Sequence, residues 1–212
     1  MRIVKDAAER KNEILDVAEE LFTQKGFDDT STNDIINVIG IARGTLYHHF
    51  KSKEEILDAV IERMEGQLLA TARMIATDRS IPILQRLTQT IMALNVDTTL
   101  GHEVIKQVHR PQNALLHQKM QKRIIAEIVP IVGNLIFEGV TLGIFNTKHP
   151  IEAAEMIMIY SNIAFDEIME HPRDEIMKKI QAFIYHTERV LGAKQGILVE
   201  VIMPIFLKEI NG

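Results

Sequence analysis

The chain has 212 residues, a length that fits one large domain or two small ones. Hydrophobic residues make up 46% of the sequence and charged residues 25%, a composition that indicates a globular protein and excludes a disordered or fibrous one. The sequence contains no cysteine, which excludes a disulfide framework, thiolate catalysis and cysteine-ligated metal centres. The formal net charge of −5 argues against binding of polyanions over the whole surface.

Neither a membrane span nor an export signal is predicted. No stretch without a charged residue exceeds ten residues, as in 128–137 and 156–165, whereas a membrane span needs about 18 apolar residues. The N-terminus becomes charged at once and lacks an apolar signal core. We therefore expect a soluble, cytoplasmic protein that does not associate with a membrane.

The spacing of apolar residues predicts an all-α fold. Apolar residues recur at intervals of three and four almost throughout, and alternating β-branched runs are scarce. Pro150 and Pro172 each stand where the first residue of a helix is expected. A break is expected at Pro111 and a kink at Pro130. The expected helices lie near residues 4–24, 32–39, 43–50, 53–77, 81–97, 101–120, 121–145, 151–170, 173–192 and 196–208.

Residues 32–50 are predicted to form two short helices joined by a glycine-containing turn. Ser31 and Asp34 have the spacing of a capping box that starts the first helix, and Gly40 ends it. With a longer helix on each side, this layout is typical of a helix-turn-helix unit. The second short helix, about 12 Å long, matches the width of the major groove of DNA.

The local charge of this segment favours DNA binding. Residues 35–53 contain Arg43, Lys51, Lys53 and two histidines but no aspartate or glutamate, a net charge of +3. A second capping box, Ser52-x-x-Glu55, places Lys53 at a helix N-terminus, where backbone amides also suit a phosphate oxygen. Short capped helices with a glycine turn also occur in other all-α proteins, so spacing alone leaves DNA binding and a purely structural role open.

One motif within this segment resembles a known family. Residues 44–53 read Gly-Thr-Leu-Tyr-His-His-Phe-Lys-Ser-Lys and meet every fixed position of G-[TS]-[LIF]-Y-x-[HY]-F-x-x-K. Over about residues 8–60 the chain resembles the DNA-binding domain of the tetracycline-repressor (TetR) family. Ala42 stands where that family often has a capping serine or threonine, an exchange that costs about 1 kcal/mol of helix stability.

The resemblance implies a division of the chain and a set of DNA contacts. Residues 1–52 are expected to form a helix-turn-helix DNA-binding domain, and residues 53–212 a helical effector-binding and dimerisation domain. Phosphate contacts are expected from Thr32, Thr45, Tyr47, His48 and Lys53. Base-edge contacts are expected near Arg43 and Gly44, and His49 completes the predicted DNA-binding set.

The function implied is that of a homodimeric transcriptional regulator, expected to be a repressor that binds a palindromic operator in double-stranded DNA and is released by a small molecule. The expected subunit interface is the helix pair near 151–170 and 173–192. The first helix of this pair is apolar nearly all round, which independently favours burial on two faces. The candidate effector-pocket residues are His102, His109, Phe137, Met158 and Asn162. Other methionines able to line such a cavity, although most are expected to be core, are Met74, Met92, Met120 and Met156.

No metal, cofactor or catalytic residue is predicted. His102, His109 and His117 lie seven and eight residues apart, which is not a metal-binding spacing, and Lys106 replaces the second histidine of an HExxH motif. A helical enzyme is one alternative, but the sequence lacks a glycine-rich phosphate loop and a nucleophile elbow. A helix-turn-helix protein that acts through protein partners is another. Gly139 and Gly143 are expected on one face of a closely packed helix.

Overall fold

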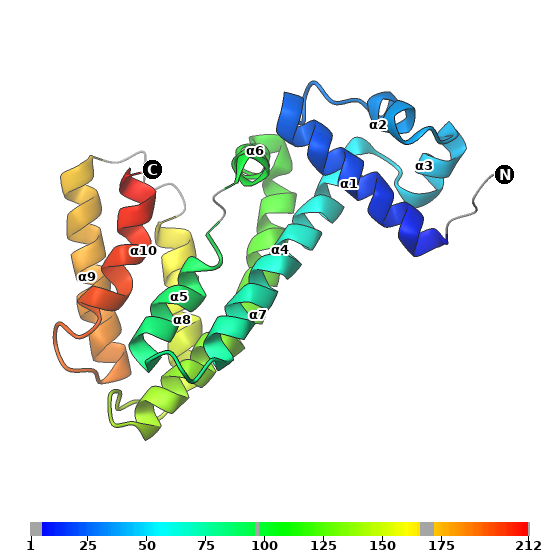
Figure 1. The fold of residues 1–212 in the computed structure, drawn as a ribbon. Coiled ribbons are helices and arrows are strands. Elements are labelled where there is room, and N and C mark those ends of the chain that lie inside the picture. Colours follow the sequence, from blue (N-terminus) through cyan, green and yellow to red (C-terminus); the bar gives the residue numbers. More distant parts are fainter. Residues whose placement is uncertain (1–5, 96–97, 166–171, 212) are drawn as a thin grey trace. The chain divides into compact units, whose positions relative to one another are not determined.

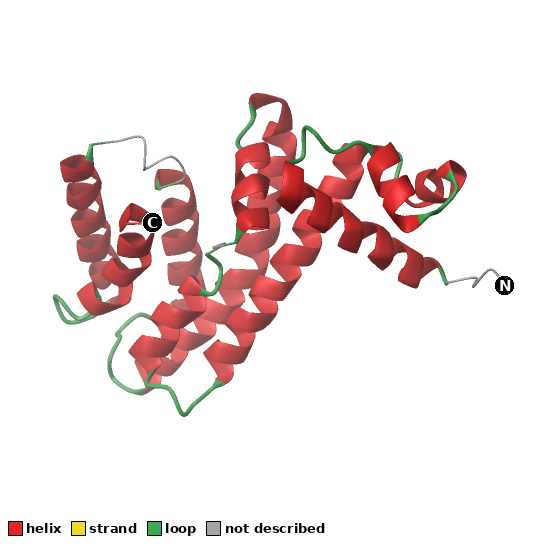
Figure 2. Ribbon diagram, turned by 45° about the horizontal axis from the view of Figure 1, so that its top comes forward, coloured by secondary structure: helices red, strands yellow, loops and turns green. Residues whose placement is uncertain are grey.

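The computed structural model describes residues 6–95, 98–165 and 172–211, the last four without their side chains. This described part is helical and contains no strand, which confirms the predicted all-α fold (Figure 2). In chain order the elements are α1 (Ala7–Lys25), α2 (Thr32–Ile39), α3 (Arg43–His49), α4 (Lys53–Thr77), α5 (Ile83–Met92), α6 (Thr99–Val108), the 3-10 helix η1 (Pro111–Asn113), α7 (Ala114–Thr141), α8 (Pro150–Ala164), α9 (Arg173–Leu191) and α10 (Val199–Asn211).

Two helices differ from their predicted limits for clear local reasons. α1 begins at Ala7 rather than near residue 4, because the Asp6 carboxylate accepts the Glu9 amide at 2.8 Å in a capping box. Residues 4 and 5 lie outside the described part. The predicted boundary between 120 and 121 is wrong, since α7 continues through that point and through Pro130. Burial of the neighbouring apolar residues offsets the backbone hydrogen bond that a proline removes.

Other ends move by a few residues. Pro150 is the first residue of α8, as predicted, but Pro172 is the residue before α9 rather than its first. α10 begins three residues late because Gly196, with φ of +87°, lies within a turn that continues through Leu198. α5 ends at Met92 and α8 at Ala164. The remainder of the two longer helices predicted there falls partly on 96–97 and 166–170, outside the described residues.

The described residues divide into two compact units. This division does not test the domain boundary predicted at 52/53, which stays a prediction. One unit contains the residues up to Gly66 together with 98–120. In it α1, α2 and α3 gather around the start of α4 (Figure 1). Arg63 of α4 pairs with Asp16 and Glu19 of α1. Side chains that share the core of this unit include Ile14, Ala18, Phe22, Ile35, Leu46, Phe50, Ile56, Val60, Val104 and Val108.

The second unit contains 67–95 and the described residues after 120. Its core is aliphatic with an aromatic cluster contributed by α8, α9 and α10. Arg86, which is buried, donates to the carbonyl oxygens of Ala76 at 3.1 Å and Ile81 at 3.0 Å and pairs with Glu138. This ion pair fastens α5 to α7.

The predicted glycine face is only partly correct. A Cβ on Gly139 would lie 2.4 Å from the ring of Phe145, so the expected close packing exists, although a side chain rather than a backbone makes it. Gly143 lies beyond the end of α7, with φ of +72°. It therefore serves a turn and does not share a helix face with Gly139.

One helical segment among the described residues is long and apolar enough to cross a membrane by length and composition alone. An 18-residue stretch of this segment, Pro111–Thr141, has a mean hydropathy of 1.7, and 44% of the stretch is buried within the structure. Core helices of soluble proteins pass the same test. This stretch includes charged residues, whereas the absence of a membrane span was expected from the length of uncharged stretches alone.

Candidate nucleic-acid interface

The helix-turn-helix is built by local capping. The Ser31 hydroxyl accepts the Asp34 amide at 3.2 Å and the Asp34 carboxylate accepts the Ser31 amide at 2.7 Å, which confirms the predicted capping box. The Ser31 hydroxyl also donates to the Asp34 carboxylate at 2.7 Å, and this bond, followed by those from the Ser31 amide and Lys25, lowers the pKa of Asp34 to about 2. Gly40 ends α2 in the left-handed conformation, with φ of 73°. Ala42 precedes α3 and makes no side-chain cap, as expected from its methyl side chain.

α3 has one buried face and one exposed face. Leu46 is buried, while Arg43, Gly44 and His48 are exposed and Thr45 is half-buried. A Cβ on Gly44 would meet no atom within 4 Å. The first turn of α3 therefore presents the charged side chain of Arg43 next to the backbone of Gly44, which no side chain in the described part of the chain covers.

Tyr47 joins the exposed faces of the two short helices. Its hydroxyl lies 3.4 Å from the hydroxyl of Thr32, and the Arg43 guanidinium stands 5.3 Å from its ring centroid. Thr32 and then Arg43 lower the pKa of Tyr47. The structure thus brings three predicted DNA-contacting residues together.

His49 lies on the opposite side of α3 from this cluster. It is half-buried, and its pKa is lowered by burial and by the nearby charges of His48, Arg10 and Lys11. Its ring meets that of His48 edge to face, at 5.2 Å between centroids. His48 is exposed and His49 faces α1, so the two histidines lie in different environments.

Lys53 has contacts that the sequence does not predict. Its ammonium donates to the carbonyl oxygens of Phe27 at 2.8 Å and Asp28 at 3.2 Å, and lies 4.2 Å from the centre of the Phe27 ring. An ammonium has three N–H donors, so one remains for a phosphate. The second predicted capping box is half correct. Ser52 accepts the amide of Glu55 at 3.1 Å, but the Glu55 carboxylate accepts the amide of Lys51.

Two residues that the sequence did not predict hold the same loop, one on α6 and one just after it. Glu103 accepts the Phe27 amide at 3.0 Å, and Arg110 donates to both carboxylate oxygens of Asp28, at 2.7 and 2.5 Å. The Arg110 hydrogen bond lowers the pKa of Asp28 and in turn raises that of Arg110. Burial works to raise the pKa of Glu103, but hydrogen bonds from Phe27 and Gln107 outweigh it and lower the pKa.

The candidate effector residues fall into both units. His102 and His109 are exposed in the first, where the His109 ring meets that of His117 at 4.9 Å. Phe137, Met158 and Asn162 belong to the second. Phe137 is 61% exposed, while Met158 and Asn162 are half-buried on successive turns of α8. Among the methionines expected to line a cavity, Met74 and Met156 are exposed. Within the described residues no group of three possible metal ligands occurs.

α8 carries an apolar groove that is open to solvent. Its lining residues are Glu155, Met156, Ile159, Tyr160, Ile163 and Ala164. Ile163 is 72% exposed. One face of α8 packs on the core through Ala153 and Ala154. Of the two faces that were predicted to be buried, the single chain therefore buries one.

Comparison with known proteins decides the family. A model described as bacterial regulatory proteins, tetR family, matches residues 14–60, and a tetracyclin repressor-like C-terminal domain matches residues 97–186. Both models represent one family, and together they match more than half of the chain. The chain belongs to the TetR family. Because this is a family of regulators, membership confirms the prediction that the chain is not an enzyme.

Individual relatives of this TetR-family chain match part of their own length. The HTH-type transcriptional repressor KstR2 of Mycolicibacterium smegmatis is 32% identical over 117 residues, which are 55% of this chain and 52% of that repressor. KstR2 of Mycobacterium tuberculosis is 36% identical over 92 residues, 43% of this chain and 46% of that repressor. The chain therefore matches about half the length of these curated relatives.

The fold is also that of a solved TetR-family structure. A transcriptional regulator from Pectobacterium atrosepticum superposes with a TM-score of 0.65 at 20% identity, over 88% of this chain and 98% of that chain. At this identity the likeness concerns the fold alone.

Proposed function

We propose that this TetR-family chain is a transcriptional repressor that binds a palindromic DNA operator as a homodimer in the cytoplasm and is released by a small molecule. The observation that carries the proposal is the exposed first turn of α3. There the Arg43 guanidinium and the bare backbone of Gly44 project from a helix that is anchored by buried Leu46. Arginine reaches a guanine edge with two hydrogen bonds, and a glycine permits close approach.

A second copy of the chain is proposed to cover the groove on α8. One short reading helix contacts too few base pairs for useful specificity, so a palindrome read by two copies is favoured. A two-fold interface uses the same patch on both subunits, which suits an apolar face along a single helix. The proposed interface combines this face of α8 with α9.

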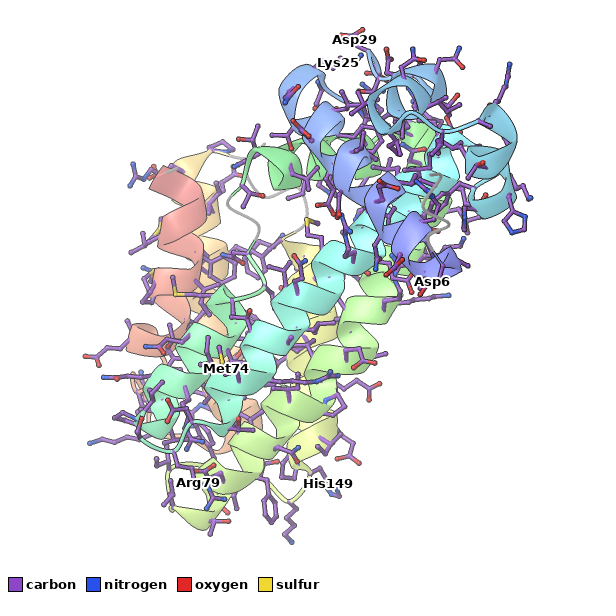
Figure 3. All side chains as sticks on the ribbon, turned by 45° about the vertical axis from the view of Figure 1, so that its right-hand side comes forward. Asp6, Lys25, Asp29, Met74, Arg79 and His149 are labelled. Atoms are coloured by element: carbon purple, nitrogen blue, oxygen red, sulfur yellow. The ribbon has the colours of Figure 1, made fainter. Side chains whose placement is uncertain are left out.

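Sedimentation of point variants tests the interface. Ile163→Asp places a charge in the groove and is expected to convert the dimer into monomers. Met74→Asp is the matched control, because Met74, like Ile163, is a well-exposed apolar residue of the second unit (66% exposed). It lies on α4, outside the groove (Figure 3). A dimeric Ile163→Asp protein contradicts the proposed interface.

The proposed effector is a small, largely apolar molecule bound in the C-terminal domain. Met158 and Asn162 of α8 offer one apolar and one polar side chain, both half-buried. α4 is continuous from Lys53 to Thr77 and gives the chain a helical connection between the DNA-binding motif and this domain. Linkage requires that effector and operator weaken each other's binding by the same factor, about 5- to 150-fold in coupled systems.

The effector is tested in two steps. Native mass spectrometry of protein purified from its host identifies a co-purifying molecule, and calorimetry then measures its affinity for free and operator-bound protein. Weaker binding to the operator complex is expected. Equal affinities contradict release by that molecule.

Footprinting on DNA upstream of the protein's own gene separates direct repression from action through protein partners. Purified protein alone is expected to protect an inverted repeat. Protection that requires an added protein favours the partner-dependent alternative.

A further inference from the structure

The connection between α1 and α2, residues 26–30, is held by side chains from outside the helix-turn-helix. Its backbone begins at Gly26 with φ of +81°, and Thr30 closes it by donating to the Gly26 carbonyl at 2.7 Å. α6 contributes Glu103, and the residue Arg110 follows soon after that helix. Glu103 and Arg110 bind two consecutive residues of the loop, Phe27 and Asp28. All of these residues belong to the first unit.

We propose that Glu103 and Arg110 are positioning residues for DNA binding, an inference that rests on the proposed function. They fix the loop that leads directly into Ser31 and Thr32 at the start of α2. Thr32 in turn contacts Tyr47 of α3. Neither Glu103 nor Arg110 needs to touch DNA to affect its binding.

The geometry explains why these two side chains suit the role. A guanidinium that donates to both oxygens of one carboxylate fixes orientation as well as distance. The Glu103 carboxylate oxygen lies 3.5 Å from the position a Cβ of Gly26 would take, so it is seated directly against the turn. A loop ordered before binding loses less conformational entropy when the complex forms.

For one variant, the proposal predicts a change in DNA affinity opposite in sign to the change expected from net charge alone. Replacement of Asp28 by asparagine removes a negative charge from a DNA-binding unit, which by charge alone strengthens binding to a polyanion. If Asp28 instead receives Arg110 to fix the loop, Asp28→Asn weakens binding. Asp29 supplies the matched control, because it is the adjacent exposed aspartate and makes no hydrogen bond or ion pair in the described part of the chain (Figure 3).

Fluorescence anisotropy with an operator duplex selected for the wild-type protein measures these effects. Asp28→Asn and Arg110→Gln are each expected to weaken binding about three- to tenfold for a dimer, the effect of removing a modest ion pair from both subunits. The double variant is expected to bind no more weakly than either single variant. Asp29→Asn is expected to bind as tightly as the wild type or slightly more tightly.

Two further measurements separate positioning from other roles. Arg110→Gln is expected to leave the salt dependence of binding unchanged, since removal of a phosphate-binding cation from each subunit would flatten it by about one unit per subunit. Lys119→Gln controls for charge, because it removes an exposed cation of the first unit that pairs with Asp58 and not with the loop. Glu103→Ala is expected to weaken binding while Glu103→Gln restores it, because the glutamine carbonyl still accepts the Phe27 amide.

Several results overturn the inference. They are Asp28→Asn binding like Asp29→Asn, strictly additive losses in the double variant, and a flattened salt dependence for Arg110→Gln. Circular dichroism at the assay temperature confirms that each variant is folded. Failure of the wild-type protein to bind any duplex refutes the proposed function instead, which keeps the two failures distinct.

Discussion

Gly44 is the position where stability and DNA affinity are expected to change in opposite directions. It is the second residue of α3, is exposed, and has open space out to 4 Å around the position that a methyl group would take. Alanine is favoured over glycine within helices by about 0.5–1 kcal/mol. Gly44→Ala is therefore expected to raise the free energy of unfolding by about 0.5 kcal/mol, the lower end, because the residue lies in the first turn.

The same methyl group is expected to obstruct the operator. If the Gly44 backbone approaches base edges, a methyl there displaces contacts worth about 1–3 kcal/mol each. Operator affinity is then expected to fall about tenfold or more. Thermal denaturation followed by circular dichroism measures the first effect, with a rise in Tm of about 1–2 °C, and anisotropy titration at fixed salt measures the second.

Gly66→Ala is the matched control for this variant. Gly66 is also exposed and has no atom within 4 Å of a Cβ, but it lies in the middle of α4. Its substitution is expected to stabilise the protein by about 1 kcal/mol without changing operator affinity. Operator binding by Gly44→Ala at wild-type strength refutes the placement of Gly44 against DNA, and equal loss of affinity in both variants refutes it as well.

Three other variants test the DNA-binding unit. Lys53→Ala is expected to weaken binding to all operators alike and to flatten the salt dependence by about one phosphate per subunit, whereas Arg43→Ala is expected to change the preference among operators, as competition titrations will show. Ala42→Ser supplies the missing cap of α3 and is expected to raise Tm through about 1 kcal/mol of added stability. The Asp34 carboxyl, with its pKa lowered to about 2, is expected to stabilise the fold fully above its ordinary value of 3.8 and to lose this effect as pH falls toward 2. Carboxyl titration by nuclear magnetic resonance checks the last point, and an Asp34 midpoint near 3.8 contradicts it.

The features predicted correctly from sequence are those encoded by neighbouring residues. The Ser31–Asp34 capping box, the end of α2 at Gly40 and the uncapped Ala42 are set by residues within three positions of each helix end. The all-α fold follows from the same short-range periodicity. Helix ends are predicted less accurately where a competing local group acts, as the Asp6 cap does at the start of α1.

The features missed depend on residues far apart in the chain. Lys53 reaches the Phe27 carbonyl across 26 positions, and Arg110 reaches Asp28 across 82. Neither pair has a spacing that marks it in the sequence, because helix packing brings them together. Glu103 stands out in the sequence only as part of an incomplete zinc motif, although its carboxylate binds the loop of the helix-turn-helix.

Selection from a random-sequence duplex library tests the central claim most directly, that α3 of each subunit in a dimer reads DNA. The wild-type protein is expected to enrich an inverted repeat, and Arg43→Ala is expected to enrich a repeat altered at symmetrically placed base pairs in both halves. Enrichment of no inverted repeat, or of the same repeat by both proteins, contradicts the claim.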